Sequence, residues 1–419
     1  MNSNRPVERR EVKELAAPAA TVTRQPRGYG RWFTMAAFAG IAAVANVAAG
    51  LSVKYLPMRP DVGIWRAYPS NPWLDGWTRW DAGWWCTIAS RGYNFIGGSG
   101  GVQRPTHFFP VYALLMRAVG AVIGDVMLAG ILVTLAAGLG CAIAFHEWCK
   151  HWLQSEATRI AVLVLLLYPF AFFLYGAVYS DALSLLLTLF AFVLLENDRP
   201  ILAGLAGAVA TGTRPVAPAL VLGLVLRMLE LRGFFAWTAG RSGKRSSWSL
   251  RFGRLRLRDG GVLLSVLGVG VYSFYLWRRF GDPLNWINTL EDWGVRSGPA
   301  TWFKVGSFQQ LAQGHWTYVQ LFLLANLVPM ILVLALLPHV FRRFGWAYGS
   351  YTVMALAIPF INDPELTGMG RYILPAFPCF AAAGDFLSRH RGAAWPLLAF
   401  SGTVMLGLLS AFARWYWLA

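Results

Sequence analysis

Four short polar segments hold the side chains that could carry out a reaction. They are Arg79-Trp80-Asp81-Ala82, Tyr179-Ser180-Asp181, Thr213-Arg214-Pro215 and Gly370-Arg371-Tyr372. Each lies beside an apolar run, and burying an ionisable group at membrane depth is costly unless the group pairs or functions. A carboxylate placed there can accept a proton from a nucleophile, and guanidinium groups can bind a departing phosphate bidentately. These residue types are typical of a transfer reaction with an anionic leaving group.

Each segment also has a purely structural interpretation. Asp81 could form an ordinary loop ion pair with Arg79, and Asp181 could do no more than start the next helix. Arg214 could extend its guanidinium to lipid head groups, and Arg371 could be an interfacial anchor. Residue type alone does not decide between these interpretations, so the surrounding elements have to be considered.

The composition predicts which kind of element positions these side chains. The chain has 419 residues, of which 56% are hydrophobic and 14% charged, and its mean hydropathy is +0.47. An ordinary soluble domain carries about 25% charged residues, so soluble and disordered chains are both excluded. Because lipid satisfies no backbone polar group, apolar runs of roughly 20 residues should be helices. The sequence predicts an all-α polytopic membrane protein.

The apolar runs give the expected membrane spans. These are 33–53, 124–147, 158–176, 181–196, 260–279, 316–340, 345–361, 373–387 and 394–413. A further region, 200–230, is either one tilted span or two short helices, because Arg214 and two prolines interrupt it.

The basic residues predict how these spans are oriented. Cytoplasmic loops collect Lys and Arg, and an arrangement with the N-terminus inside places 23 of the 37 basic residues on the cytoplasmic side. They include a basic tail at 1–31, expected to be disordered, and an Arg-rich loop at 231–259. The net charge of +17 is thereby explained without a nucleic-acid partner. The same arrangement puts the four polar segments on the non-cytoplasmic face of a transmembrane domain at 32–419.

The first outer loop, 54–123, is expected to be long and partly embedded in the membrane. Its segment 107–124 is apolar enough to cross, but a crossing there would invert every later loop. We therefore expect an interfacial helix, with Arg117 at the head groups. The four cysteines and six histidines show no disulfide or metal-ligand spacing, and Asp363 and Glu365 have no third ligand near them. We expect no cofactor and no divalent metal.

Several motifs resemble the PIG-V-type mannosyltransferases. WTRWDAGWWCTIASRGY at 77–93, followed by HFFPVYALLMR at 107–117, resembles the first-loop signature of that family. Three later segments are similar to further family elements: YPFAFFLYGAVYSDALSL at 168–185, ATGTRPV at 210–216 and GRYILPAFP at 370–378. The resemblance extends from about residue 33 to 413, and the tail and the 231–259 loop fall outside it.

The resemblance implies a GT-C glycosyltransferase fold, a bundle of 10–11 transmembrane helices, in an inverting enzyme that uses a polyprenyl-phosphate sugar. Eukaryotic members use dolichyl-phosphate mannose to add the second mannose of the GPI anchor. The family's first-loop acid maps onto Asp81 as the catalytic base, and its basic positions map onto Arg214 and Arg371 as donor-phosphate ligands. Asp181 stands where the family usually has Glu, and its shorter side chain favours acceptor binding or loop support. The same supporting or acceptor-binding role is assigned to Arg79, Trp80, Tyr179, His107 and Tyr372.

The predicted function is transfer of a sugar, mannose by resemblance, to a hydroxyl of a lipid-linked or cell-envelope glycan. The residues themselves do not distinguish mannose from arabinose or galactose. The composition favours a bacterial plasma membrane, where the acceptor would be a glycolipid, a lipoglycan or a protein hydroxyl. A transporter or flippase for lipid-linked sugars and a non-catalytic subunit of a glycosylation complex are alternatives. A transporter should show internal repeats, which the sequence lacks.

Overall fold

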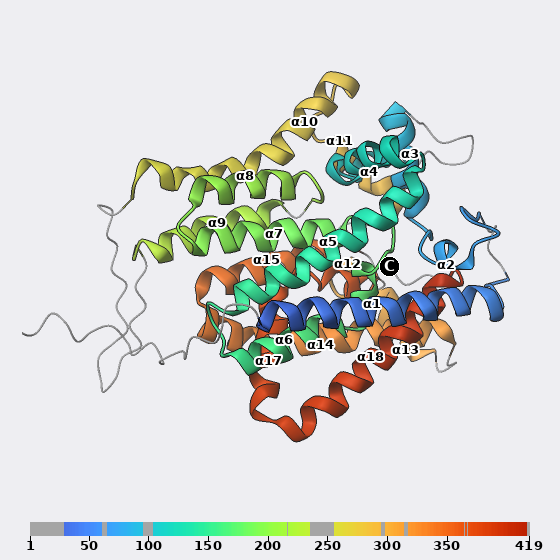
Figure 1. Ribbon diagram of the computed structural model, residues 1–419. Coiled ribbons are helices and arrows are strands. Elements are labelled where there is room, and N and C mark those ends of the chain that lie inside the picture. Colours follow the sequence, from blue (N-terminus) through green and yellow to red (C-terminus); the bar gives the residue numbers. More distant parts are fainter. Residues whose placement is uncertain are drawn as a thin grey trace, which may run out of the picture.

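The computed structural model describes residues 29–60, 65–94, 104–215, 217–234, 255–294, 298–313, 317–363, 365–366 and 368–416. Within these ranges every regular element is a helix, and most of the helices run side by side along the long direction of a bundle (Figure 1). The all-α class predicted from composition is therefore confirmed. Most of the basic tail 1–31 and of the Arg-rich loop 231–259 lies outside the described residues.

Among the described residues, five helical stretches are long and apolar enough to cross a membrane by themselves. They are α1 (Tyr29–Tyr55), α5 (Val126–Cys149), η5 with α10 (Leu257–Phe280), α14 (Tyr318–Phe344) and α18 (Arg391–Ala413). At 1.5 Å per residue a stretch of 23 residues is about 35 Å long, against about 30 Å of hydrocarbon.

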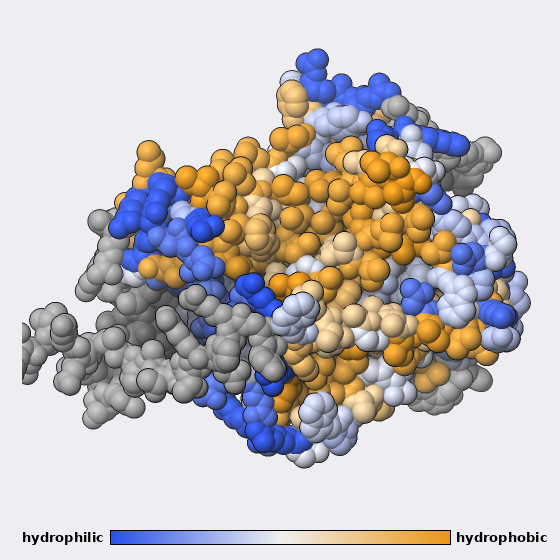
Figure 2. Space-filling model, viewed as in Figure 1, coloured by the Kyte–Doolittle hydropathy of each residue, from blue (hydrophilic) through white to orange (hydrophobic). Residues whose placement is uncertain are grey.

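The distribution of hydrophobic residues on the surface, like the helix lengths, indicates a protein that spans a membrane. In the space-filling view, hydrophobic residues cover the middle of the molecule, and hydrophilic residues gather at its ends (Figure 2). Many large apolar side chains of the long helices are exposed, among them Val271 of α10 and Phe400 of α18. Water would not tolerate a continuous apolar surface of this kind. The protein is therefore an integral membrane protein.

Shorter helices complete the bundle and its caps. Those of eight residues or more are α3 (Ala82–Arg91), α4 (Pro110–Ile123), α6 (Ser155–Leu166), α7 (Asp181–Glu196), α8 (Pro200–Thr211), α9 (Ala217–Leu231), α13 (Val305–Ala312), α15 (Trp346–Asn362) and α17 (Phe377–Arg389). The shortest turns are α2 (Pro72–Asp75), η1 (Gly92–Asn94), η2 (Pro105–His107), η3 (Ala171–Leu174), α11 (Asn285–Asn288), η6 (Leu290–Trp293), α12 (Pro299–Trp302) and α16 (Met369–Tyr372).

The span predicted at 158–176 is only partly a helix. Helix α6 ends at Leu166, because Pro169 removes a backbone donor and disfavours helical geometry in the residue before it. The chain then forms the short turn η3 and an irregular stretch up to Asp181. In this stretch Val178 N donates to Trp77 O (3.2 Å). The early break therefore fastens the residues before α7 to the segment that contains Asp81.

The region 200–230 folds as two short helices rather than one tilted span. Helix α8 ends at Thr211 and α9 begins at Ala217, with Arg214 and Pro215 in the turn between them. Helices α7, α8 and α9 lie beside one another (Figure 1), so this turn returns to the end of the bundle where α7 begins. Arg214 is thereby carried to the start of α7, where Asp181 lies.

Helix α4 covers most of the segment expected to be interfacial. Its 14 residues span about 21 Å, which is too short for a perpendicular crossing. It ends at Gly124, whose φ of 82° lies in the left-handed region, and Asp125 then caps α5 by accepting from Met127 N (2.9 Å) and Leu128 N (3.0 Å). The sharp turn packs α4 back on α5. Its depth in the membrane stays a prediction.

Close packing at Gly138 gives a test of this architecture. A Cβ added to Gly138 in α5 would lie 2.0 Å from the Leu174 carbonyl oxygen of η3, a backbone atom that cannot easily move. We expect Gly138→Ala to destabilise the protein by about 1–3 kcal/mol, measured by thermal unfolding in detergent. The matched control is Gly40→Ala in α1, where no atom lies within 4 Å of the added Cβ. Equal melting temperatures for the two variants would contradict this packing.

Candidate active site

Arg79 anchors the segment before Asp81 and is fully buried. Its Nε donates to Ala413 O at the end of α18 (2.8 Å), and its Nη2 donates to Asp75 Oδ2 (2.8 Å). Asp75 also accepts from Arg66 Nε (2.8 Å). The ordinary ion pair considered between Asp81 and Arg79 is therefore not formed. Arg79 supports the site through the backbone it holds, and its partner Asp75 was not singled out from the sequence.

The backbone at Trp80 and Asp81 turns sharply into α3. Trp80 has φ of +54°, a left-handed conformation that is uncommon outside glycine. Asp81 follows as the N-cap residue of α3, but its side chain makes no capping hydrogen bond. Its backbone N–H donates to Tyr179 Oη (3.2 Å). The Asp81 carboxylate is thus free of the usual capping role and available to other groups.

Asp81 is one end of a chain of four alternating charges. Arg371 Nη1 lies 3.3 Å from Asp81 Oδ2, and Arg371 Nε lies 3.9 Å from Asp181 Oδ1. Asp181 Oδ1 in turn forms a direct ion pair with Arg214 Nη1. The structure therefore brings together acids and arginines from all four polar segments, up to 290 positions apart in sequence. Two carboxylates and two guanidinium groups give this cluster a formal charge of zero.

The two acids differ in accessibility. The Asp81 side chain is 18% exposed and the Asp181 side chain 2%. Burial raises the pKa of Asp81 above its ordinary value, and the neighbouring guanidinium of Arg371 opposes this rise. A carboxylate with a raised pKa that small molecules can reach is suited to accept a proton. Asp181 is enclosed between arginines and is suited to hold them in place.

Asp181 does not act as a simple helix cap. Helix α7 begins at Asp181, and the N-cap residue is Ser180, which makes no side-chain capping bond. The Asp181 carboxylate pairs with Arg214 instead. Its place in the first turn of α7 also puts it at the positive end of the helix dipole.

Two tyrosines hold the arginines from their sides. The Arg371 guanidinium lies over the Tyr179 ring (5.1 Å) and donates through Nη2 to Tyr372 Oη (3.1 Å). The Arg214 guanidinium lies over the ring of Tyr372 (5.4 Å). Cation–π contacts of this kind stabilise a buried cation without neutralising it. Tyr179 and Tyr372, both expected as supporting residues, therefore contact the charged cluster directly.

His107 lies in an aromatic environment beside the site. Its ring packs on Phe108 (4.1 Å between ring centres) and on Trp293 (4.4 Å). Burial lowers the pKa of His107 to about 3, so its imidazole is neutral at physiological pH. Its described ring contacts are with aromatic residues rather than with the four charges, which favours a supporting role.

The described residues contain no group of three His, Cys, Asp or Glu side chains placed to hold a metal ion. Glu365 N donates a hydrogen bond to Asp363 Oδ1 (3.1 Å). Metal independence of the reaction stays a prediction.

No protein-family model matches the chain, and no curated protein matches it significantly. Solved structures do match. ArnT from Cupriavidus metallidurans bound to undecaprenyl phosphate is 16% identical with a TM-score of 0.50, over 86% of this chain and 62% of ArnT. The fold of this chain is therefore similar to that of ArnT, a glycosyltransferase of the GT-C type. An oligosaccharyltransferase from Archaeoglobus fulgidus in its apo form is 13% identical with a TM-score of 0.44, over 91% of this chain and 56% of the enzyme.

At these identities the GT-C likeness concerns the fold alone. The chain spans less than two thirds of ArnT and of the oligosaccharyltransferase. Neither of the two matched structures is a PIG-V-type mannosyltransferase, so the resemblance to that family stays a prediction. Within the GT-C fold of this chain, the observation that bears on chemistry is the cluster of Asp81, Arg371, Asp181 and Arg214.

Proposed function

We propose that this protein is an inverting glycosyltransferase that moves a sugar from a polyprenyl-phosphate donor to a hydroxyl of a lipid-linked or cell-envelope glycan. Mannose is the proposed sugar on the strength of the PIG-V resemblance. The observation that carries the proposal is the contact between an accessible carboxylate, Asp81, and the buried guanidinium of Arg371, with Arg214 close by. The likeness to ArnT, whose structure holds undecaprenyl phosphate, supports a lipid-phosphate donor.

The proposed step is a direct displacement at the anomeric carbon of the sugar. The acceptor oxygen forms a bond to this carbon while the bond from the carbon to the phosphate oxygen breaks, and its electron pair leaves with the lipid phosphate. Asp81 takes the proton of the acceptor hydroxyl. The phosphate gains negative charge as it leaves, so Arg371 and Arg214 bind the transition state more strongly than the intact donor. Attack from the face opposite the phosphate inverts the anomeric centre.

The proposed location of the site is the non-cytoplasmic face of a bacterial plasma membrane. The support is the distribution of basic residues, which favours a cytoplasmic N-terminus and leaves the four polar segments outside. A lipid-linked donor would enter from the bilayer, and α4 packs on both α3, which follows Asp81, and α5. Labelling of single cysteines introduced beside Trp65 and beside Arg342 from the two sides of the membrane would test this orientation.

The raised pKa of Asp81 predicts the acid side of the pH profile. A general base works only when deprotonated, so activity is present above the pKa of Asp81 and is lost as the pH falls through it. Because burial raises this pKa above the ordinary 3.8, the acid limb of kcat/KM should lie at a higher pH than for an exposed aspartate. A profile that stays flat down to about pH 4 would contradict a role for Asp81 as base.

The proposed function is tested by sugar transfer with purified protein in detergent. Radiolabelled polyprenyl-phosphate mannose is supplied with a crude extract of envelope lipids and polysaccharides, with and without a chelator. We expect transfer by the wild type in both conditions and none by Asp81→Asn. Failure of polyprenyl-phosphate mannose and of the other polyprenyl-phosphate sugars would overturn the proposal in favour of a transporter or a non-catalytic subunit.

A further inference from the structure

A groove lined by tryptophans runs along α3, beginning within one helical turn of Asp81. It has a volume of about 590 Å³, and we call it the Trp groove. Its aromatic lining is Trp65, Trp80, Trp84 and Trp415, and its other lining residues are Gly83, Cys86, Thr87, Ser90 and Arg91. A cavity of this size is ordinary for a ligand site.

The α3 residues of the Trp groove share one face of the helix. Trp84, Thr87 and Arg91 are spaced three or four positions apart, which places them in one row, and Trp80 lies just before the helix begins. The helix of ten residues is about 15 Å long, so the row is longer than a single sugar ring. Asp81 stands at the start of this row. A chain of rings lying along α3 would therefore end beside the proposed base.

The tryptophans of the groove come from three segments that are distant in sequence. Trp80 and Trp415 pack edge to face, with ring centres 5.3 Å apart, and Trp84 packs in the same way on Trp293 (5.2 Å). Trp65 is 50% exposed, whereas Trp415 is 6% exposed. Tryptophans of a membrane belt lie separately at the level of the head groups. Here the rings converge on one concave surface and are held by aromatic neighbours.

Backbone strain is concentrated at the same place. Trp80 has φ of +54° and Trp415 has φ of +71°, and they are two of the four non-glycine residues with positive φ in the described ranges. Bulky side chains adopt this conformation at a cost, and such residues cluster at ligand-binding sites. The two strained residues are the two rings in contact across the groove. The fold thus keeps the rings of Trp80 and Trp415 in contact although both residues have an unfavourable backbone conformation.

The aromatic and hydroxyl-bearing lining of the groove suits a carbohydrate. Its hydroxyl-bearing residues Thr87 and Ser90, with Arg91 at the far end, offer hydrogen bonds, and no carboxylate is among its described lining residues. The negative face of an indole ring attracts the C–H groups on the face of a sugar ring. A peptide that binds by adding a strand would need a free strand edge, and the described part of the chain contains no strand.

We propose that the Trp groove binds the acceptor as a glycan, whose sugar rings stack on the tryptophans and whose terminal hydroxyl reaches Asp81. This inference rests on the proposed function for the position of the reacting hydroxyl. The groove identifies where the glycan acceptor binds, which the charged cluster of Asp81, Arg371, Asp181 and Arg214 does not. Trp65 and Trp415, which were not singled out from the sequence, become acceptor-binding residues.

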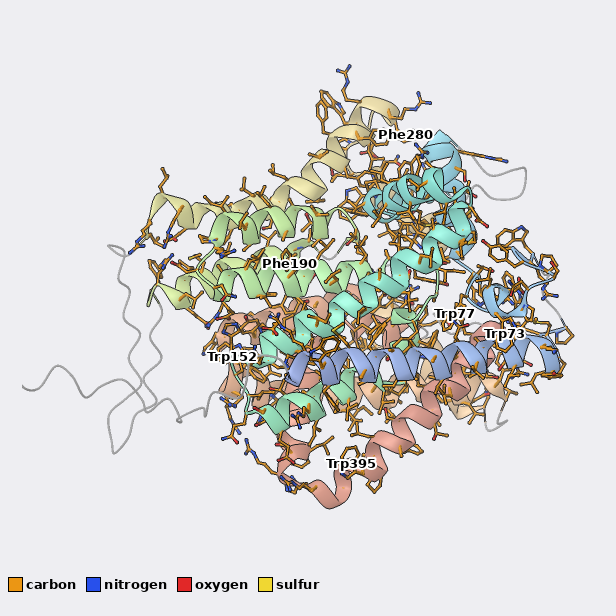
Figure 3. The ribbon with its side chains drawn as sticks, viewed as in Figure 1. Trp73, Trp77, Trp152, Phe190, Phe280 and Trp395 are labelled. Carbon is orange, nitrogen blue, oxygen red and sulfur yellow. The ribbon has the colours of Figure 1, made fainter. Side chains whose placement is uncertain are left out.

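Substitutions on the two rim tryptophans test the groove. Trp65→Ala and Trp84→Ala should each raise the acceptor KM about tenfold, with kcat at saturating acceptor within about twofold of the wild type. Trp65→Tyr and Trp84→Phe, which keep an aromatic ring, should restore most of the affinity. The matched control is Trp395→Ala (Figure 3). This exposed tryptophan lies near the start of α18, whereas Trp415 follows the other end of that helix. An unchanged acceptor KM in both alanine variants would overturn the proposal while leaving the transfer reaction intact.

Direct binding measurements test whether the Trp groove binds a glycan independently of whether the protein catalyses sugar transfer. Isothermal titration of wild type with tetrasaccharides of mannose, glucose and galactose, and with a Ser/Thr-rich peptide of similar length, needs no donor. We expect at least one tetrasaccharide to bind and Trp65→Ala to weaken it, even if no donor is ever turned over. Binding of the peptide alone, or of no tetrasaccharide, would overturn a glycan acceptor.

Discussion

Replacing Asp81 by asparagine is expected to lower kcat for sugar transfer by about a thousandfold. A general base contributes roughly 10²–10⁴ to a rate, and asparagine cannot accept the proton of the acceptor hydroxyl. The change keeps the size of the side chain and the backbone contact to Tyr179 Oη, so folding should be preserved. The measurement is the single-turnover rate with saturating donor and acceptor, together with the thermal unfolding temperature.

The matched control for this variant is Asp181→Asn. It makes the same chemical change in the same charged cluster, but at a carboxylate that is enclosed and paired with Arg214. We expect its rate to fall by no more than about tenfold, because it holds an arginine and does not take the proton. If both variants lost the same activity, or if Asp81→Asn kept its activity, the assignment of the base would be wrong.

Replacing Arg371 by glutamine is expected to lower kcat/KM by about 10²–10³. Loss of one preorganised charge donor to a transition-state oxyanion has an effect of this order. The residue also separates Asp81 from Asp181, so its removal leaves two carboxylates without their shared cation. The measurement is kcat/KM for the donor, with product inhibition by polyprenyl phosphate as an independent readout of phosphate binding.

Two further variants show whether Arg371 acts by charge or by folding. Arg371→Lys keeps the charge but not the planar fork that contacts Asp81 and Asp181 together, so it should recover only part of the activity and most of the stability. Arg278→Gln removes an exposed arginine from the last turn of α10 and should change neither. Product inhibition that is unchanged in Arg371→Gln would rule out phosphate binding by this residue.

The helical fold was predictable because lipid leaves few alternatives. Apolar runs such as 394–413 coincide closely with a helix, α18, since length and hydrophobicity decide whether a segment spans. Local backbone chemistry modified this pattern in two places. Pro169 ends α6 inside the run 158–176, and the interruption at Arg214 and Pro215 separates α8 from α9. The sequence predicted the interruption at Arg214 and Pro215, but it did not decide between one tilted span and two short helices.

The residues of the candidate site could be predicted from the sequence, but the ion pairs that they form could not. Residue type and membrane depth singled out Asp81, Asp181, Arg214 and Arg371, and the structure places them in one cluster. Sequence neighbours suggested that Asp81 would pair with Arg79. Arg79 pairs instead with Asp75, and the spacing of four positions was a signal available in the sequence.

The Trp groove could not have been assembled from the sequence. Trp65 and Trp415 are far apart in the chain, and the end of α18, held by Arg79, brings Trp415 to the groove. The tryptophans of the segment 77–85 could be interpreted as a membrane belt or as a surface for stacking on a sugar, but the sequence does not show that Trp65 and Trp415 join them.

The pairing of Asp181 with both arginines has a consequence for the handling of the lipid phosphate. The two guanidinium groups are held by a carboxylate before any donor arrives, so their rotamer freedom is lost on folding and not on binding. The same carboxylate keeps two like charges from repelling one another. Under the proposed function, an arriving phosphate would exchange with an internal anion rather than fill an empty positive pocket. The return of Asp181 to its arginines after transfer would then favour release of the spent lipid carrier.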